Sequence, residues 1–453
     1  MTAVFCGINT RRDRGEEMKE IQVGLLGFGT VGTGVVRMLQ ENYSTIKHKL
    51  GATLTLKRIA VRDTKKDRGV SLEPGVLTDD FASVLADPEI SIIVELIGGY
   101  SPAREYVLAA IENGKHVVTA NKALLAFHGE EIYAAAARKG VEVRYEAAVG
   151  GGIPVLSAIK GNMGGNRFRT VFGILNGTCN YILTRMTREG ADFAMVLKNA
   201  QELGYAEADP TFDIEGIDTA HKLCLLVTLC FGTRVDLKDI HTEGISSISA
   251  MDIDFAGRFG YRIKLLAIGK RDGERVEARV QPTMVPVDDP LAGIEGVYNA
   301  IRISGDYAGT VMFSGRGAGM EPTASAVVGD IMAIARNILV GVGRRSAPLG
   351  FLDEEIISLP VKPVGETVSK YYLRFSVPDR PGMLAKIAGA LGGNGVSIKS
   401  VIQTAQRQGE AVPVVIVTHE AREMDVRKAL EIIEALEITA EKTRLLRIED
   451  DLA

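Results

Sequence analysis

A glycine-rich turn near the start of the chain limits the possible folds more than any other feature. The run Ile21–Leu26 is short and apolar, as a buried parallel strand would be, and Gly27-Phe-Gly29-Thr-Val-Gly32 follows it directly. The amphipathic run from Val35 to Leu39 then predicts a helix. A strand, this glycine spacing and a helix, in that order, predict a turn that holds the pyrophosphate of a dinucleotide at a helix N-terminus. A tight strand–helix turn without a ligand is the alternative.

Strand-like and helical patterns alternate through the first third of the chain. Further strands are expected at 54–61, 90–97, 116–119 and 141–145, and helices at 102–113 and 123–139. This alternation is typical of a doubly wound parallel sheet. We therefore expect a Rossmann-type nucleotide-binding domain over residues 21–150, closed by a later helix at about 321–342. Residues 1–20 are expected to be a disordered lead. Alternatively, the first methionine is an upstream start and the native protein begins at Met18.

The rest of the chain predicts two more domains and a linker. Residues 151–320 mix strand-like pieces (168–175, 262–269, 275–285, 298–304) with helices (181–188, 193–203, 223–231), which indicates an α+β domain. We expect this domain to serve substrate binding, catalysis and dimerisation. Residues 343–368 contain several prolines and are expected to be a linker. Residues 369–453 follow the order βαββαβ, the ferredoxin-like arrangement, with a turn at 406–409 and a last strand near 438–446.

Composition excludes several classes of protein. A length of 453 residues suits about three domains. The net charge of -4 gives no reason to expect nucleic acid as a partner, and no apolar run is long enough to span a membrane. The four cysteines (Cys6, Cys179, Cys224, Cys230) have neither metal-ligand nor redox spacing, which suits a reducing cytoplasm.

The end of the second strand bears on which dinucleotide binds. An acid there would bind the ribose hydroxyls of NAD, whereas an arginine would bind the 2′-phosphate of NADP. The chain has Arg62 followed by Asp63, with Lys65, Lys66 and Arg68 close behind. This basic cluster favours NADP and leaves NAD open, and a solvated basic loop explains it almost as well.

Lysines and carboxylates form the strongest catalytic candidate. Asp218 and Lys222 are four residues apart, so they would share one face of a helix, although such pairs are usually weak surface ion pairs. Lys122 follows the strand 116–119, where ligands of open parallel sheets bind, and Gly98 follows the strand 90–97 in the same way. The glycine-rich bend after Glu146 could hold a monovalent cation through oxygen ligands or serve as an interdomain hinge.

Together these segments resemble the homoserine dehydrogenase family over nearly the whole chain from Ile21. The blocks that carry the resemblance are Gly27–Gly32, Thr119–Lys122, Glu146–Pro154, Leu175–Ile182 and Gly204–Pro210 through to Lys222. The tail, with Asp379-Arg-Pro-Gly382, is similar to the ACT regulatory module.

The resemblance implies a reaction and roles for residues. It implies NADPH- or NADH-dependent, reversible reduction of L-aspartate 4-semialdehyde to L-homoserine in threonine, methionine and isoleucine biosynthesis. Lys222 would be the general acid/base, with Lys122 beside the nicotinamide, and Glu207 and Asp218 would bind the substrate amino group with Asp213 close by. The implied cofactor contacts are Gly27, Phe28, Gly29, Thr30, Val31, Gly32, Arg62, Gly98, Lys122, Gly204, Gly317 and Gly319. A sodium site would comprise Glu146 with the backbone of Val149, Gly151 and Ile153.

The ACT resemblance implies feedback control by a small amino acid, first of all L-threonine, with Asn394 and Gly395 as contacts. A dimerisation domain without a ligand is the alternative, and a homodimer or homotetramer is expected. The sequence also allows two other functions. One is an aldehyde-oxidising semialdehyde dehydrogenase, which would need a thiol nucleophile such as Cys179. The other is a non-catalytic sensor of dinucleotide and amino acid.

Overall fold

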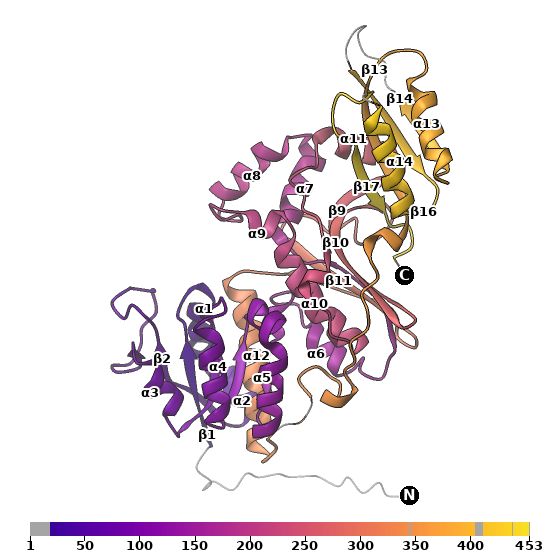
Figure 1. Cartoon of the computed structure of the whole chain (residues 1–453). Coiled ribbons are helices and arrows are strands. Elements are labelled where there is room, and N and C mark those ends of the chain that lie inside the picture. Colours follow the sequence, from indigo (N-terminus) through magenta and orange to yellow (C-terminus); the bar gives the residue numbers. More distant parts are fainter. Residues whose placement is uncertain (1–18, 344, 346, 404–410, 437, 453) are drawn as a thin grey trace, which may run out of the picture.

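The computed structural model describes residues 19–343, 345, 347–403, 411–436 and 438–452 (Figure 1). Residues 1–18 of the expected lead lie outside the described residues, and so does the turn expected at 406–409. The first strand begins at Glu20. In the described part of the chain, every helix is too short or too polar to cross a membrane.

The N-terminal domain is a parallel sheet of six strands in the order β3-β2-β1-β4-β5-β6. Its strands are β1 (Glu20–Leu26), β2 (Thr53–Ala60), β3 (Leu77–Thr78), β4 (Ile90–Glu95), β5 (His116–Thr119) and β6 (Val143–Arg144). Its helices are α1 (Thr30–Glu41), α2 (Tyr43–Leu50), α3 (Phe81–Ala86), α4 (Ala103–Glu112) and α5 (Lys122–Lys139). The strand order reverses between β1 and β4, so the expected Rossmann-type fold is confirmed and its ligand crevice lies at this switch point.

A distant segment completes this domain. Helix α12 (Met320–Leu339) lies among the indigo and purple elements of the N-terminal domain although it follows the catalytic domain in sequence (Figure 1). It packs along α1, where a Cβ added at Gly34 would approach the Met320 side chain to 2.8 Å. The buried side chains Val327, Val328 and Ile331 join the core beneath α1. The chain therefore crosses twice between the first two domains, which brings residues from both to one crevice.

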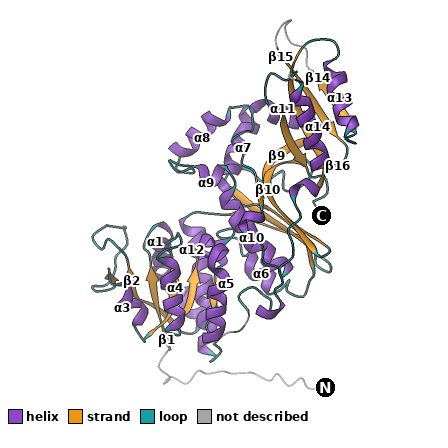
Figure 2. Cartoon of the chain, viewed as in Figure 1, coloured by secondary structure: helices purple, strands orange, loops and turns teal. Residues whose placement is uncertain are grey.

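The catalytic domain contributes five neighbouring strands to a second, eleven-stranded sheet, in the order β12-β11-β7-β9-β10. These are β7 (Phe168–Ile174), β9 (Tyr261–Asp272), β10 (Arg275–Pro286), β11 (Tyr298–Gly305) and β12 (Gly309–Arg316), with the short β8 (His241–Thr242) paired to β10. Helices α6 (Val155–Lys160), α7 (Gly177–Glu189), α8 (Phe193–Glu202), α9 (Thr211–Ile214), α10 (Ile217–Phe231) and α11 (Ala250–Arg258) accompany them (Figure 2). Strand β12 was not expected from the sequence.

The remaining short 3₁₀ turns are η1 (Glu146–Ala148), η2 (Leu237–Asp239), η3 (Asp353–Glu355) and η4 (Val364–Glu366). Helix α10 is the central element of the catalytic domain, because its residues from Asp218 to Phe231 are all buried. It packs against α5 of the N-terminal domain and against β7, β9 and β10. Any charged group on α10 must therefore find its partners inside the protein.

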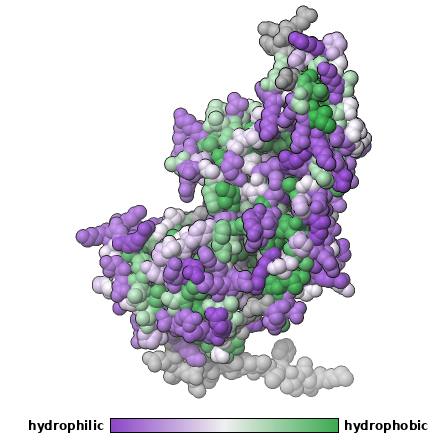
Figure 3. Space-filling view, in the orientation of Figure 1, coloured by the Kyte–Doolittle hydropathy of each residue, from purple (hydrophilic) through white to green (hydrophobic). Residues whose placement is uncertain are grey.

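The C-terminal domain has the expected ferredoxin-like order. It comprises β13 (Val368–Pro378), α13 (Met383–Gly393), β14 (Ile398–Gln403), β15 (Ala411–Thr418), β16 (Ala421–Arg422), α14 (Glu423–Ala435) and β17 (Arg444–Ile448). The last strand begins at Arg444, later than expected. The domain has its own apolar core, and hydrophobic residues also gather on its visible surface (Figure 3).

This domain is not structurally separate. Strand β17 pairs with β10 in parallel, Thr283 opposite Arg447, so one sheet runs from the catalytic domain into the C-terminal domain. The sequence predicts the order of strands and helices within this unit but not the pairing of β17 with β10, because local patterns do not report pairing between strands so far apart in the chain.

Candidate active site

A cleft of about 670 Å³ lies between the N-terminal and catalytic domains. Ten of the residues singled out from the sequence line it: Val31, Lys122, Gly151, Gly204, Glu207, Asp213, Asp218, Lys222, Gly317 and Gly319. The other predicted cofactor and cation residues are not among its lining residues: Gly27, Phe28, Gly29, Thr30, Gly32, Arg62, Gly98, Glu146, Val149 and Ile153. Asn394 and Gly395 belong to the C-terminal domain.

Two lysines from different domains hold one carboxylate in this cleft. Lys222 Nζ lies 2.7 Å from Asp218 Oδ2, and Lys122 Nζ lies 3.2 Å from Asp218 Oδ1. Lys222 also donates to the backbone carbonyl of Leu175 at 2.7 Å. Lys222 and Asp218 are only 9% and 5% exposed, so this is a buried cluster and not the weak surface pair that spacing alone suggests.

The charges of the cluster are interdependent. Burial alone would raise the pKa of Asp218, but the ammonium groups of Lys222 and Lys122 outweigh burial and hold that pKa well below its usual value. Asp213 differs, because burial and the neighbouring charge of Asp218 raise its pKa. Asp218 is thus a permanent anion that fixes both ammonium groups at the cleft.

Asn176 is a site residue that the sequence analysis did not identify. Its side-chain Nδ2 donates to Asp213 Oδ1 at 2.8 Å and to Asp218 Oδ2 at 2.9 Å. Its Oδ1 accepts from the backbone N–H of Cys179, which caps the N-terminus of α7. The available signal was an asparagine before a helix, which predicts a cap but not contacts with two distant carboxylates.

The glycine turn has the geometry expected of a phosphate-binding loop. Gly27 has φ +95°, and a Cβ there would lie 2.6 Å from the carbonyl of Leu96. A Cβ at Gly32 would lie 2.5 Å from the carbonyl of Gly27, which forces close packing of helix on strand. A Cβ at Gly29 would meet nothing within 4 Å. The turn is therefore closed on the protein side and open where a pyrophosphate would approach.

The loop that carries Gly98 is fixed beside Lys122. The buried carboxylate of Glu95 accepts from the Gly98 N–H at 3.1 Å and from the Thr119 hydroxyl at 2.6 Å. Asn121, which caps α5 directly before Lys122, donates to the carbonyl of Gly99 at 2.7 Å. These bonds tie the ends of β4 and β5 together on the crevice side of the sheet.

The loop after β2 is organised by two residues that point back into it. Asp63 Oδ1 accepts from the backbone N–H groups of Lys65 and Lys66 at 2.9 and 3.2 Å. Arg68 donates to the carbonyl of Phe28 at 2.8 Å and its guanidinium lies 5.2 Å from the Phe28 ring centroid. Phe28 itself is buried, so any contact it makes with a cofactor would be through its backbone. Arg62 is exposed at the end of the strand.

Glu146 caps a helix. Its two carboxylate oxygens accept from the N–H groups of Leu156 and Ser157 in the first turn of α6, each at 2.8 Å. Its own N–H donates to the buried Asp330 at 2.8 Å. The described residues contain no cluster of three or more His, Cys, Asp or Glu side chains able to hold a metal. A cation at this bend would therefore depend on backbone carbonyls as well as on Glu146.

Cys179 does not have the surroundings of a nucleophile. It is fully buried, its Sγ lies 3.2 Å from the carbonyl of Asp213, and burial raises the pKa of its thiol well above the ordinary value. A covalent mechanism needs an accessible thiolate. The structure argues against the thiol-dependent alternative.

The fold and the cleft define a Rossmann-type, NAD(P)-dependent oxidoreductase. Three family models match the chain: "Homoserine dehydrogenase, NAD binding domain" over residues 27–146, "Homoserine dehydrogenase" over 154–332 and "ACT domain" over 371–438. The homoserine dehydrogenase of Synechocystis sp. is 46% identical, covering 94% of this chain and 99% of that protein. That of Pseudomonas aeruginosa is 44% identical over 95% and 99%. The chain belongs to the homoserine dehydrogenase family.

Solved structures agree with this assignment. A homoserine dehydrogenase from Thiobacillus denitrificans superposes with a TM-score of 0.90 at 45% identity, covering 96% of this chain and 99% of that one. One from S. aureus gives a TM-score of 0.75 at 33% identity, with 96% and 100% covered. These relatives cover 94–96% of this chain.

Proposed function

We propose that this protein catalyses the reversible reduction of L-aspartate 4-semialdehyde to L-homoserine, with Lys222 as general acid/base. The observation that carries the proposal is the pair of ammonium groups held on Asp218 inside the cleft. In the reducing direction, the nicotinamide would supply a hydride to the aldehyde carbon. Lys222 would give a proton to the carbonyl oxygen, and Lys122 would stabilise the negative charge that develops there. In the reverse direction Lys222 would accept the hydroxyl proton.

Substrate orientation is assigned to the acidic side chains of the cleft. Glu207 and Asp213 line it together with Asp218. Asp218 is already paired with both lysines, so Glu207 and Asp213 would carry most of the attraction for the substrate ammonium. Holding that group fixes which face of the aldehyde meets the hydride.

The proposed cofactor is NADP, with NAD as the alternative. The open side of Gly29 and the N-terminal N–H groups of α1 suit the pyrophosphate. One carboxylate oxygen of Asp63 accepts hydrogen bonds from the backbone of its own turn, whereas Arg62 is exposed at the strand end. That arrangement favours a 2′-phosphate over ribose hydroxyls. Gly204, Gly317 and Gly319 line the cleft and would let the backbone approach the cofactor.

A sodium ion at the bend after Glu146 belongs to the same proposal. Glu146 and the carbonyls of Val149, Gly151 and Ile153 offer only oxygen donors, which suit a hard cation. The ion would order the bend that joins the two domains. A higher melting temperature in sodium chloride than in choline chloride at equal ionic strength would support this site. Equal melting temperatures in the two salts would contradict it.

Regulation and assembly complete the proposal. The ACT domain would bind L-threonine as a feedback inhibitor, and the protein would form a homodimer or homotetramer. Strand β12 supports assembly, because it is an edge strand whose outward face carries the exposed Met312. Light scattering on the purified protein measures the assembly, and a monomer would contradict it.

One assay tests the central claim. Purified full-length protein is incubated with L-homoserine and either oxidised cofactor, and reduced nicotinamide is followed by absorbance. The expected result is turnover with both cofactors and a higher kcat/KM with NADP. Cofactor binding without turnover of homoserine or aspartate semialdehyde would favour the non-catalytic sensor.

A further inference from the structure

Asn299 lines the active-site cleft but takes no part in the reaction as proposed above. It lies near the start of β11, it is only 1% exposed, and its side-chain Oδ1 is buried without a hydrogen-bond partner among the described residues. Buried polar groups are normally paired, because leaving one unpaired costs about 1–3 kcal/mol. An unpartnered acceptor in the wall of a cleft indicates that a ligand supplies the donor.

The side chain of Asn299 is held between two glycines that also line the cleft. A Cβ at Gly317 would lie 2.1 Å from Asn299 Nδ2, and a Cβ at Gly177 would lie 3.7 Å from Asn299 Oδ1. Gly317 is not among the glycines with positive φ, so glycine is needed there for space and not for backbone conformation. The missing side chain of Gly317 therefore leaves the amide its place in the wall.

Asn299 lies beside the loop that leads back to the nucleotide-binding domain. It pairs with Gly315 of β12, and the chain continues from there through Gly317 into α12. This loop packs on the glycine-rich bend that joins the two domains, because the N–H of Gly152 donates to the carbonyl of Arg316 at 3.2 Å. Gly317 is proposed to contact the cofactor, so the amide of Asn299 is next to the expected path of the cofactor.

The nicotinamide end of the cofactor is the end that this wall would meet. A dinucleotide bound at the glycine turn places its two halves on opposite sides of the switch point in the sheet. The loop after β2 is proposed to bind the 2′-phosphate, so the adenosine half lies toward Arg62. The nicotinamide half then lies toward Lys122, in the cleft that Asn299 lines.

The donor for Asn299 Oδ1 can be chosen by chemistry. The substrate ammonium is assigned to Glu207 and Asp213, and a carboxylate attracts an ammonium more strongly than a neutral amide does. The substrate carboxylate has no proton to donate. The nicotinamide carries a neutral carboxamide whose NH2 group donates, and this group suits a neutral acceptor.

We propose that Asn299 Oδ1 accepts a hydrogen bond from the carboxamide NH2 of the nicotinamide. The bond fixes the rotation of the nicotinamide ring in the cleft, and with it the ring face that meets the aldehyde. Asn299 is thus a cofactor-binding residue that sets the geometry of hydride transfer. The inference rests on the proposed function, because it takes a nicotinamide cofactor as given.

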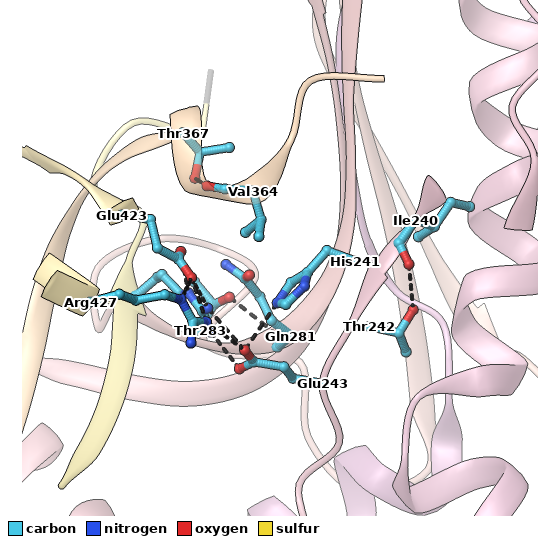
Figure 4. Close-up of polar contacts among 11 residues, drawn as sticks. Ile240, His241, Thr242, Glu243, Gln281, Thr283, Val364, Thr367, Glu423 and Arg427 are labelled. Carbon is cyan, nitrogen blue, oxygen red and sulfur yellow. Dashed lines mark hydrogen bonds and ion pairs between the residues drawn. The ribbon is translucent and has the colours of Figure 1, made fainter. Parts of the chain in front are cut away.

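Gln281 provides a matched control within the same protein (Figure 4). It is fully buried, and neither atom of its amide has a partner among the described residues. It lies at the junction of the catalytic and ACT domains, close to the ion pairs of Arg427 with Glu243 and Glu423 (Figure 4). Gln281 is not among the residues that line the active-site cleft. Its removal therefore shortens a buried amide side chain without touching the cofactor.

The test compares NADP with its 3-acetylpyridine analogue, in which a methyl group replaces the carboxamide NH2. Calorimetry on full-length protein measures the two dissociation constants. We expect wild-type protein to bind the analogue about tenfold more weakly than NADP, or by ~1.4 kcal/mol. Asn299→Ala should bind NADP about tenfold more weakly than wild type and bind both dinucleotides about equally, because the acceptor is gone. Gln281→Ala should keep the wild-type ratio of the two constants.

Two results would overturn the proposal. One is equal binding of NADP and the analogue by wild-type protein, which decides the matter even if Asn299→Ala does not fold. The other is a wild-type ratio retained in folded Asn299→Ala, and a raised KM for homoserine in that variant would then assign Asn299 to the substrate.

The ratio of dissociation constants does not depend on turnover. A protein that discriminates between the two dinucleotides but does not oxidise homoserine would support the Asn299 contact and refute the catalytic proposal. Turnover of homoserine without discrimination would do the reverse.

Discussion

Lys122 of the N-terminal domain lies 3.2 Å from Asp218 of the catalytic domain, so one ion pair joins the two domains across the active-site cleft. The other oxygen of that carboxylate is held by Lys222 at 2.7 Å. The geometry of Lys222, the proposed proton donor, therefore depends on both domains being in place.

Replacing Lys222 by alanine should remove the proposed proton donor and leave the glycine turn untouched. We expect kcat to fall by roughly 10²–10⁴-fold, the usual contribution of a general acid/base, with unchanged affinity for the reduced cofactor. Stopped-flow kinetics and fluorescence titration measure the two quantities. Lys238→Ala, at an exposed lysine, is the matched control. A Lys222→Ala protein that turns over near the wild-type rate would refute the assignment.

Replacing Arg62 by alanine tests cofactor choice. The guanidinium is proposed to bind the 2′-phosphate, so KM for NADP should rise about tenfold or more while KM for NAD changes little, since a charge-assisted hydrogen bond contributes about 1.5–3 kcal/mol. Arg68→Ala makes an informative comparison. Arg68 holds the loop onto Phe28, so its loss should weaken both cofactors alike. An equal rise of KM for NADP and for NAD in Arg62→Ala would show that Arg62 does not bind the 2′-phosphate.

The sequence predicted those parts of the site that a local pattern encodes. The glycine turn follows from its spacing and flanking elements, and Lys122 follows from its position after a strand. The pairing of Asp218 with Lys222 follows from helical spacing. The burial of Asp218 and Lys222 does not follow from spacing, because it depends on α10 packing against α5 and three strands. Asn176 and the pairing of β10 with β17 were missed for the same reason, since their partners come from distant segments.

Cys179 separates the two enzyme hypotheses. It is buried and its thiol pKa is raised by burial, so Cys179→Ala should retain most activity and lose only some stability from the small cavity. Steady-state kinetics and thermal melts measure both. Native protein should also resist iodoacetamide at this position by mass spectrometry. Abolished turnover in a folded Cys179→Ala protein would revive the thiol mechanism.

Arg374 tests whether the ACT domain is structurally fused to the catalytic domain. It donates from Nε to Asp252 of α11 at 2.7 Å, Asp252 is fully buried, and Tyr372 donates to the same carboxylate at 3.0 Å. Removing one partner of a buried pair leaves an unpaired charge and typically costs about 3–5 kcal/mol. Arg374→Ala should therefore lower the unfolding free energy by roughly that amount in urea melts. Arg422→Ala, whose exposed pair with Asp425 lies within one domain, should lose less than about 1 kcal/mol.

A double variant and a pH series sharpen this prediction. Asp252→Asn removes the charge and keeps one carbonyl oxygen, which can accept either from Tyr372 or from the cap of α11, so Arg374→Met/Asp252→Asn should recover part of the loss. Burial opposes ionisation of Asp252, yet Arg374 outweighs burial and lowers the pKa of Asp252 in the folded protein. The contribution of the pair is therefore complete above the unfolded value of ~3.9 and is lost as pH falls through the folded value. In Arg374→Ala burial acts without the guanidinium and raises the folded pKa of Asp252, so the difference between wild type and Arg374→Ala should be largest at pH 8 and shrink as pH falls through the raised pKa of the variant toward the lowered pKa of the wild type. A difference that already disappears at pH 6 would show that another group controls the junction.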